Sequence, residues 1–299
     1  MFRFLDKPWF CILFAFSLAF ISFKLIKPST RRHAPSKIFQ DIHGKKTYKV
    51  DWKHTYDSVE VSKLYDIIKQ PFFYYGKGKQ CYVFLSQDGE YVVKFIMHKR
   101  LAPRELTILE KLAMKNPKLE KKKRQQELFN SFIISYEDIP LATGTEAVYL
   151  KQQEIAMGIF TLVDERGNVC KVNAKDVEFI LQKRARLVKP EIIRLMYEKN
   201  VDAAKRRIDQ VFQLLVDCAK DGVQDTDSGL VRNNNIGFLE DRAIYIDTGK
   251  LVRSKKMTKK PNFEKDLKRL KPLQNWLKAY YPELAEYYDE RKEVVLKSF

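Results

Sequence analysis

Two strand-like runs joined by a tight-turn signal constrain the fold of this chain more than any other feature. Residues 81–86 and 90–96 are rich in β-branched and aromatic residues, and Gln87-Asp88-Gly89 separates them. Asp-Gly is a strong signal for the turn of a β-hairpin. The second run, EYVVKFI, is apolar on both faces of the expected strand. It therefore predicts a strand that is covered on both sides.

Lys94 lies in the middle of this second run. A lysine can be the outward-facing member of an alternating strand. Here both faces are apolar, and a buried ammonium group without a partner is costly. We therefore expect an acidic group or a bound anion to compensate the charge of Lys94.

Gly76 and Gly78 precede the hairpin, at the point where an earlier strand would turn into it. A glycine-rich turn brings backbone N–H groups close to phosphate oxygens, and a nearby lysine adds positive charge. The two glycines and Lys94 together indicate a phosphate-binding site.

Strand-like runs dominate the first half of the chain, and helical periodicity dominates the second. Before residue 189 the patterns predict helices at 58–69 and 101–114, strands at 129–136 and 177–181, and a hairpin over 160–172. After it they predict one long helix from 190 to about 220, a small hairpin around 240–242, and helical packing over 263–288.

Length and composition are consistent with two modest lobes. The chain has 299 residues, of which 45% are hydrophobic, enough to bury a substantial core. We predict an α+β protein with a β-rich lobe over 47–188 and a mainly helical lobe over 189–299. The four cysteines lie far apart in the sequence, which argues against a zinc site or a disulfide framework; they are Cys11, Cys81, Cys170 and Cys218.

The amino terminus differs from the rest of the chain, because residues 9–23 are almost wholly apolar. A membrane span needs about 20 apolar residues and a signal-peptide core about 7 to 15, so length alone allows either. No small-x-small cleavage site follows, which favours a retained anchor within 1–27. Residues 28–46 are basic and read as a tether. The positive flank predicts a single-pass membrane protein whose C-terminal domain faces the cytoplasm.

The formal net charge of +18 suits nucleic acid, an anionic membrane surface or an acidic substrate. The sequence contains no zinc-finger pattern, RNP motif or aromatic-interleaved basic repeat, which argues against nucleic acid. Beside a membrane anchor, attraction to anionic lipid headgroups is the more economical reading. Nothing in the sequence indicates an oligomeric state.

The order of the motifs resembles that of the protein-kinase-like superfamily, in a divergent form. The stretch GKGKQCYV, from Gly76 to Val83, is similar to the family's G-x-G-x-x-G-x-V loop, with Cys81 at the third glycine. Val92-Val93-Lys94 resembles the V-A-I-K strand, and Glu105 begins a segment similar to the helix that carries the partner of the lysine. The resemblance implies a two-lobed fold in which Gly76, Gly78, Lys94 and Glu105 bind ATP.

A second pair of motifs completes the resemblance. Asn235-Ile236-Gly237-Phe238 and Ile246-Asp247-Thr248-Gly249 look like the family's N-[IL]-L and D-F-G motifs. The resemblance implies that Asn235 and Asp247 hold Mg²⁺, an ion that prefers oxygen ligands. Thr248 occupies the usual phenylalanine position, so switching by an activation loop is not carried over.

The family's catalytic aspartate lies five residues before the metal-binding asparagine, and that position is Leu230 here. Asp225 and Asp227 lie slightly upstream, and either could activate an acceptor hydroxyl. Three functions stay open: a membrane-anchored kinase acting on a protein, lipid or sugar hydroxyl; a pseudokinase scaffold that binds nucleotide or a partner without turnover; and a membrane-tethered basic adaptor.

Overall fold

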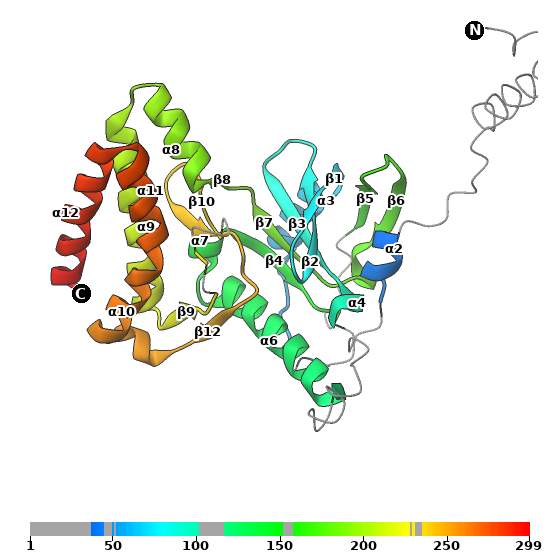
Figure 1. Ribbon diagram of the computed structural model, residues 1–299. Coiled ribbons are helices and arrows are strands. Elements are labelled where there is room, and N and C mark those ends of the chain that lie inside the picture. The colour runs from blue at the N-terminus through cyan, green and yellow to red at the C-terminus, as the bar shows by residue number, and fades with distance from the viewer. Residues whose placement is uncertain are drawn as a thin grey trace, which may run out of the picture. The chain divides into compact units, whose positions relative to one another are not determined.

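The computed structural model describes residues 37–44, 50, 52–101, 117–151, 158–227, 229–230 and 235–299. A seven-stranded sheet forms the N-terminal part of these residues (Figure 1). The strands lie in the order β4-β7-β3-β2-β1-β5-β6. Neighbours are antiparallel except for β1 and β5. The strands are β1 (Pro71–Lys77), β2 (Cys81–Ser86), β3 (Tyr91–Ile96), β4 (Thr145–Tyr149), β5 (Ile159–Val163), β6 (Val169–Asn173) and β7 (Phe179–Lys183).

The β2–β3 hairpin confirms the prediction made from the Asp-Gly turn. Gly89 has a φ of +76°, a conformation that glycine adopts without strain. Strand β3 lies between β2 and β7, and it is covered on both faces. Val93 and Phe95 belong to one buried cluster, whereas Ile96 belongs to a second.

A different set of helices covers each face of the sheet. Helices α2 (Lys37–Ile42) and α3 (Ser58–Ile68) contribute to the cluster that contains Val93, and the apolar face of α6 (Pro117–Glu137) contributes to the cluster that contains Ile96. Two short helices, α4 (His98–Leu101) and α7 (Pro140–Thr143), and the 3-10 turn η1 (Ala174–Asp176) complete this part.

The predicted strand at 129–136 is wrong, because these residues form the last two turns of α6. Phe129, Phe132, Ile133 and Tyr136 follow the i, i+3, i+4, i+7 spacing of a helix, although the run also contains enough apolar residues to read as a strand. The preceding segment, KLEKKKRQQEL, consists of good helix formers. It extends the helix and decides between the two readings.

The predicted long helix from 190 to 220 is two helices, α8 (Val188–Tyr197) and α9 (Val201–Lys220). The chain turns at Lys199, whose φ is +57°. Asn200 then caps α9, because its side chain accepts a hydrogen bond from the Ala203 N–H at 3.1 Å. Sequence periodicity does not register such a break when apolar residues continue on both sides of it.

The helical part continues to the C-terminus, with a proline in the first turn of each of its last three helices. It contains η2 (Lys255–Thr258), α10 (Lys260–Leu267), η3 (Lys268–Leu270), α11 (Lys271–Tyr280) and α12 (Pro282–Ser298). Their buried residues pack with those of α8 and α9 in a single cluster. The chain therefore has the predicted α+β arrangement, with a β-rich N-terminal part followed by a mainly helical one.

Two small sheets lie against the helices. Strands β8 (Arg186–Leu187), β10 (Ile236–Phe238) and β11 (Ala243–Tyr245) form one, and β9 (Val223–Asp225) pairs with β12 (Leu251–Arg253) in the other. The β10–β11 pair is the predicted second hairpin. At Gly237 a Cβ atom would lie 2.8 Å from the Arg186 carbonyl oxygen, so glycine is needed for β10 to approach β8.

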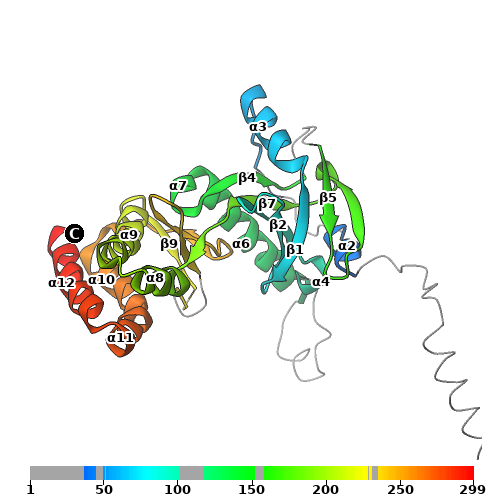
Figure 2. The same cartoon turned by 90° about the horizontal axis from the view of Figure 1, so that it is seen from above.

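Helix α6 connects the sheet to the helical part, and Figure 2 shows α6 and α7 between them. The Ser131 hydroxyl donates to the Thr248 carbonyl oxygen at 2.6 Å and accepts from the Leu251 N–H at 2.5 Å. Asp138, just after α6, pairs with Arg253 at 2.6 Å. The segment that follows Asp247 is therefore fastened to α6 at several points.

Residues 37–42, predicted as part of the tether, form α2. Its apolar side chains Ile38, Phe39 and Ile42 are buried in the core of the sheet. Their spacing places them on one side of a helix, a signal that the surrounding basic residues obscure.

Three predictions fall outside the described residues: the anchor at 1–27, the part of the 101–114 helix beyond Leu101, and Glu105. In the described part of the chain, no helix is long and apolar enough to cross a membrane.

Candidate active site

A cavity of about 380 Å³ lies where the glycine hairpin, the segment after β7 and the loop after β11 meet. Five of the residues predicted for the site line it, although they come from positions up to 171 residues apart: Gly76, Gly78, Lys94, Asn235 and Asp247. The topology explains this convergence. Strand β8 pairs with β10, which brings the second hairpin against the edge of the cavity opposite β3.

Lys94 joins the sheet to the second hairpin. The residue is 9% exposed, and its ammonium group donates a hydrogen bond to the Ile246 carbonyl oxygen. Burial lowers the pKa of Lys94, and the negative charge of Asp247 partly opposes this shift. The carboxylate from the second hairpin therefore acts on the lysine from the sheet, as the motif order implies.

The glycines at 76 and 78 are explained neither by backbone strain nor by packing. Neither is among the positive-φ residues, and a Cβ atom at Gly76 would meet no atom of the described residues within 4 Å. At Gly78 the one contact with a described atom would be the Cys81 carbonyl oxygen, at 4.0 Å. Close approach of a ligand to the backbone is a remaining reason for glycine at both positions.

Asp247 is exposed, and one of its carboxylate oxygens is held by a hydrogen bond. Its Oδ1 accepts a hydrogen bond from the Gly249 N–H at 3.0 Å. A Cβ atom at Gly249 would lie 2.4 Å from the side-chain oxygen of Gln80, so a larger residue there would displace the end of that side chain. Within the described residues, Oδ2 of Asp247 accepts no hydrogen bond, which leaves it available to a cation.

Asp227 and Asn235 contact each other directly. The Asn235 Nδ2 group donates to Asp227 Oδ2 at 3.1 Å. The Asn235 backbone is fixed as well, because its N–H donates to the Leu230 carbonyl oxygen at 2.9 Å and its carbonyl oxygen accepts from the Ile246 N–H at 2.7 Å. Since Nδ2 faces Asp227, the amide oxygen of Asn235 stays available as a ligand.

The residues present fit a magnesium ion that is completed by a nucleotide. No group of three or more His, Cys, Asp or Glu side chains in the described ranges is arranged to hold a metal on its own. Mg²⁺ commonly binds through one or two protein oxygens together with phosphate oxygens and water. The available oxygens of Asn235 and Asp247, beside Lys94 and the glycines, meet that requirement.

The structure separates the two aspartates proposed as base. Asp225 is 1% exposed, and its carboxylate is occupied twice. Its Oδ1 accepts from the Asp227 N–H at 2.8 Å, and its Oδ2 accepts from Arg269 at 3.2 Å. In the Asp227 carboxylate only Oδ2 accepts a hydrogen bond from the described residues, and its donor is Asn235. Asp225 is therefore an internal support, and Asp227 is the better candidate to meet an acceptor.

Arg269 is a residue that sequence reasoning missed. It donates to the carbonyl oxygens of Asp225 and Asp227 as well as to the Asp225 carboxylate, and Asp266 holds it at 2.7 Å. The i, i+3 spacing of Asp266 and Arg269 signals a helical ion pair. No feature of the sequence links that pair to a loop more than 40 residues earlier.

Replacing Asp225 with Asn is expected to flatten the pH dependence of stability. Burial raises the pKa of Asp225 to about 6, from an ordinary value of 3.8. The folded protein therefore holds this proton more tightly than the unfolded chain, so the stabilisation is complete below about pH 4 and is lost as the pH rises through about 6. The loss is at most about 3 kcal/mol. Urea unfolding at about pH 4.5 and about pH 7.5 measures it.

The matched control is Asp66→Asn, since Asp66 is exposed and pairs only with Lys69 among the described residues. Its pH profile should follow that of the wild type. If the Asp225→Asn profile also ran parallel to the wild type, the raised pKa would be contradicted.

The predicted carboxylate partner of Lys94, Glu105, is not among the described residues. The described helix beside the lysine is α6, which buries Leu128 and Phe132 against the sheet, and Phe132 lines the cavity. Among the described residues, Asp247 supplies the carboxylate whose negative charge acts on Lys94.

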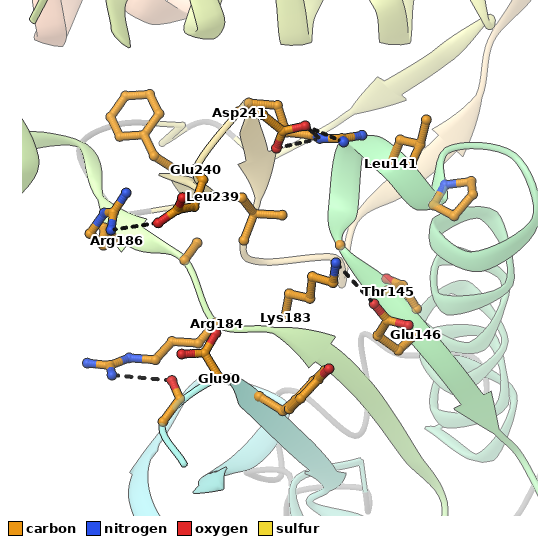
Figure 3. A pocket seen from close by; sticks show the side chains of 17 residues that line it. Glu90, Leu141, Thr145, Glu146, Lys183, Arg184, Arg186, Leu239, Glu240 and Asp241 are labelled. Carbon is orange, nitrogen blue, oxygen red and sulfur yellow. Dashed lines mark hydrogen bonds and ion pairs between the residues drawn. The ribbon is translucent and has the colours of Figure 1, made fainter. Parts of the chain in front are cut away.

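A second cavity of about 890 Å³ shares Lys183, Arg184 and Ala185 with the first (Figure 3). Some of its charged side chains pair with one another: Lys183 with Glu146 at 3.7 Å, and Arg186 with Glu240 at 4.0 Å. The described residues that were predicted for the site do not line it. Several of its charges are paired within the protein, and none of those predicted residues is in its wall, so it is the weaker candidate for the site.

Comparison with known proteins gives partial similarity to solved structures. No protein-family model matches the sequence, and no curated protein matches it. The chain is similar to a crystal structure of WbdD at 17% identity and a TM-score of 0.36, covering 75% of this chain and 46% of that one. A structure described as the bifunctional kinase-methyltransferase WbdD matches at 16% identity and a TM-score of 0.33, covering 72% and 43%. The match spans less than half the length of those chains.

Proposed function

We propose that this protein is a kinase-like phosphotransferase that binds ATP with Mg²⁺ and moves the γ-phosphate to a hydroxyl group. One observation carries the proposal. Lys94 from the sheet and Asp247 from the second hairpin meet at one cavity, together with Gly76, Gly78 and Asn235. The fold of the described residues, a β-rich part followed by helices, agrees with the kinase-like resemblance of the sequence.

Each residue has a distinct task in this proposal. The Gly78 N–H donates to the Cys81 carbonyl oxygen at 2.9 Å, so the other backbone N–H groups of the glycine turn and the ammonium group of Lys94 bind phosphate oxygens. Asn235 and Asp247 would hold Mg²⁺, which when bound neutralises charge on the phosphates. Together they hold the γ-phosphate in a fixed position next to the loop that contains Asp227.

Asp227 acts on the acceptor. Its carboxylate takes the proton of the acceptor hydroxyl as that oxygen bonds to the γ-phosphorus, while the bond from the γ-phosphorus to the β–γ bridging oxygen breaks and ADP leaves. Asn235 orients the carboxylate through its hydrogen bond, and Arg269 fixes the loop through the carbonyl oxygens. The acceptor is a protein, lipid or sugar hydroxyl.

We further propose that the apolar segment at 9–23 anchors the protein as a single-pass membrane protein, with the domain described above facing the cytoplasm. The basic residues after the segment and the net charge of +18 support this orientation and contact with anionic lipid. An acceptor at the membrane surface would then be favoured over a dissolved neutral metabolite.

The full-length protein, purified in detergent, tests the proposal. MgATP should raise its melting temperature, and γ-phosphate should be released or transferred from ATP. Asp247→Ala should abolish both turnover and the Mg²⁺-dependent part of the thermal shift, because it removes a proposed metal ligand. Turnover that survives this substitution would contradict the proposed site.

A pseudokinase is the second candidate, and one observation favours it. Leu230, at the family's position for the catalytic aspartate, is fully buried and cannot accept a proton. Nucleotide binding without turnover in the same experiment would support this reading. Salt-sensitive binding to anionic vesicles that is indifferent to MgATP would instead support a basic adaptor.

A further inference from the structure

Helix α2 holds a buried acid to which the proposed function gives no role. Asp41 is 3% exposed, although a carboxylate normally stays in water unless it is paired or hydrogen-bonded. The apolar residues of α2 account for its packing against the sheet. They do not account for Asp41, so the reason for this acid has to come from its contacts.

The two oxygens of Asp41 bind groups from two different strand ends. Oδ2 accepts a hydrogen bond from the Tyr82 hydroxyl group at 3.0 Å, and Oδ1 accepts one from the Lys99 N–H at 2.7 Å. Tyr82 belongs to β2, the strand that follows the glycine turn. Lys99 belongs to α4, which begins two residues after β3 ends. The carboxylate therefore ties the strand after the glycine turn to the end of the strand that carries Lys94.

The contact with Tyr82 lies on the face of β2 that is opposite the cavity. Cys81 and Val83 line the cavity, and Tyr82 lies between them in the strand. Successive side chains of a strand point to opposite faces, so Tyr82 points away from the cavity, toward α2. A shift of Tyr82 would move the backbone that carries both of its cavity-lining neighbours.

Helix α2 is itself held firmly. Phe39 and Ile42 are buried in the core of the sheet, and α2 lies beside α4 (Figure 1). A Cβ atom at Gly44 would lie 2.3 Å from the Cβ atom of His98, so the chain just after α2 passes close against α4. The helix can therefore serve as a fixed support for the strands that it contacts.

We propose that Asp41 is a positioning residue for nucleotide binding: through Tyr82 and Lys99 it holds the glycine turn where the turn and Lys94 can bind the same phosphates. The inference rests on the proposed function and adds a coupling between α2 and the nucleotide site. Such coupling is reciprocal, so a nucleotide that favours the positioned turn must also favour the docked helix. No described residue of α2 lines the cavity, so the effect on α2 is indirect.

Hydrogen exchange of the full-length protein in detergent, followed by mass spectrometry, tests the reciprocal effect. Saturating MgATP is expected to slow exchange over residues 37–44 at least about threefold more than over α3. Helix α3 is the internal control, because it packs against the same cluster as α2 but shares no hydrogen bond with β2 among the described residues.

Tyr82→Phe removes one hydroxyl group and keeps the ring. It is expected to raise the Kd of MgATP at least about fivefold, because a hydrogen bond to a charged group is lost, and to abolish the extra slowing of exchange in α2. Tyr74→Phe is the matched control. Tyr74 lies on β1 and packs against the same cluster, and its hydroxyl makes no hydrogen bond with a described residue, so the Kd should stay within about twofold of the wild type.

Calorimetry measures the Kd, and thermal melting separates positioning from a purely structural role. A Tyr82→Phe protein that melts at a lower temperature but keeps the wild-type Kd would overturn the inference. Equal slowing of exchange in α2 and α3 of the wild type would also overturn it, and this comparison needs no variant. Both results leave the proposed function intact. Failure of the wild type to bind MgATP would remove the proposed function and the inference together.

Discussion

Replacing Asp227 with Asn is expected to lower the rate of phosphoryl transfer by at least about 10²-fold, while MgATP affinity changes little. Asn has the same shape as Asp and can keep the contact with Asn235, but its amide cannot take a proton from a hydroxyl group. Single-turnover transfer from radiolabelled ATP measures the rate, and calorimetry measures the affinity.

Asp225→Asn is the matched control for this experiment. The Asp225 carboxylate is occupied by Arg269 and by the Asp227 N–H, so the variant should keep a larger share of the activity than Asp227→Asn. If Asp227→Asn retained wild-type activity and Asp225→Asn lost it, the assignment of the two roles would be reversed. Full activity in both variants would require a base from elsewhere in the protein.

Lys94→Met is expected to separate binding from stability. Burial lowers the pKa of Lys94, so keeping its charge works against folding. The sign follows from linkage. Between the lowered pKa and the ordinary lysine pKa the unfolded chain binds more protons, so stability rises with pH across that window. Met removes both the cost and this dependence. The nucleotide-free variant should therefore melt at or above the wild-type temperature.

The same variant should lose its response to nucleotide. At a ligand concentration of about 100 times Kd, binding stabilises the wild type by about 2.7 kcal/mol, and Lys94→Met should show no such shift. Lys63→Met serves as the control, because Lys63 is exposed and pairs with Glu146 at 2.6 Å. If Lys94→Met melted well below the wild type, the ammonium group would be structural, and the reason offered for its burial would be wrong.

The parts of the fold that could be predicted are those with strong local signals. The Asp-Gly turn and the doubly apolar run from Tyr91 to Ile96 predict β2 and β3. Residues 129–136 carry apolar side chains that satisfy two periodicities, and the polar stretch upstream of them decides for α6. The break at Lys199 depends on a single backbone conformation, which apolar spacing does not report.

The residues of the candidate site also divide into those with a sequence signal and those without one. The order of the motifs predicted a shared site for five residues, because each belongs to a stretch that resembles a family pattern: Gly76, Gly78, Lys94, Asn235 and Asp247. Arg269 carries no such pattern. Its contacts depend on which carbonyl oxygens the fold places beside it, at separations of 44 and 42 residues. Side chains whose partners are backbone atoms far along the chain leave no local signature.

The double hydrogen bond of Ser131 has a consequence for control. It fastens the backbone at Thr248 and at Leu251 to α6. The buried side chain of Thr248 is also too small to swing between two pockets as a bulky aromatic ring could. An on–off device based on moving this stretch would first have to detach it from the helix. For the proposed phosphotransferase, we therefore expect control of timing to come from outside, through delivery of the acceptor to the bound nucleotide.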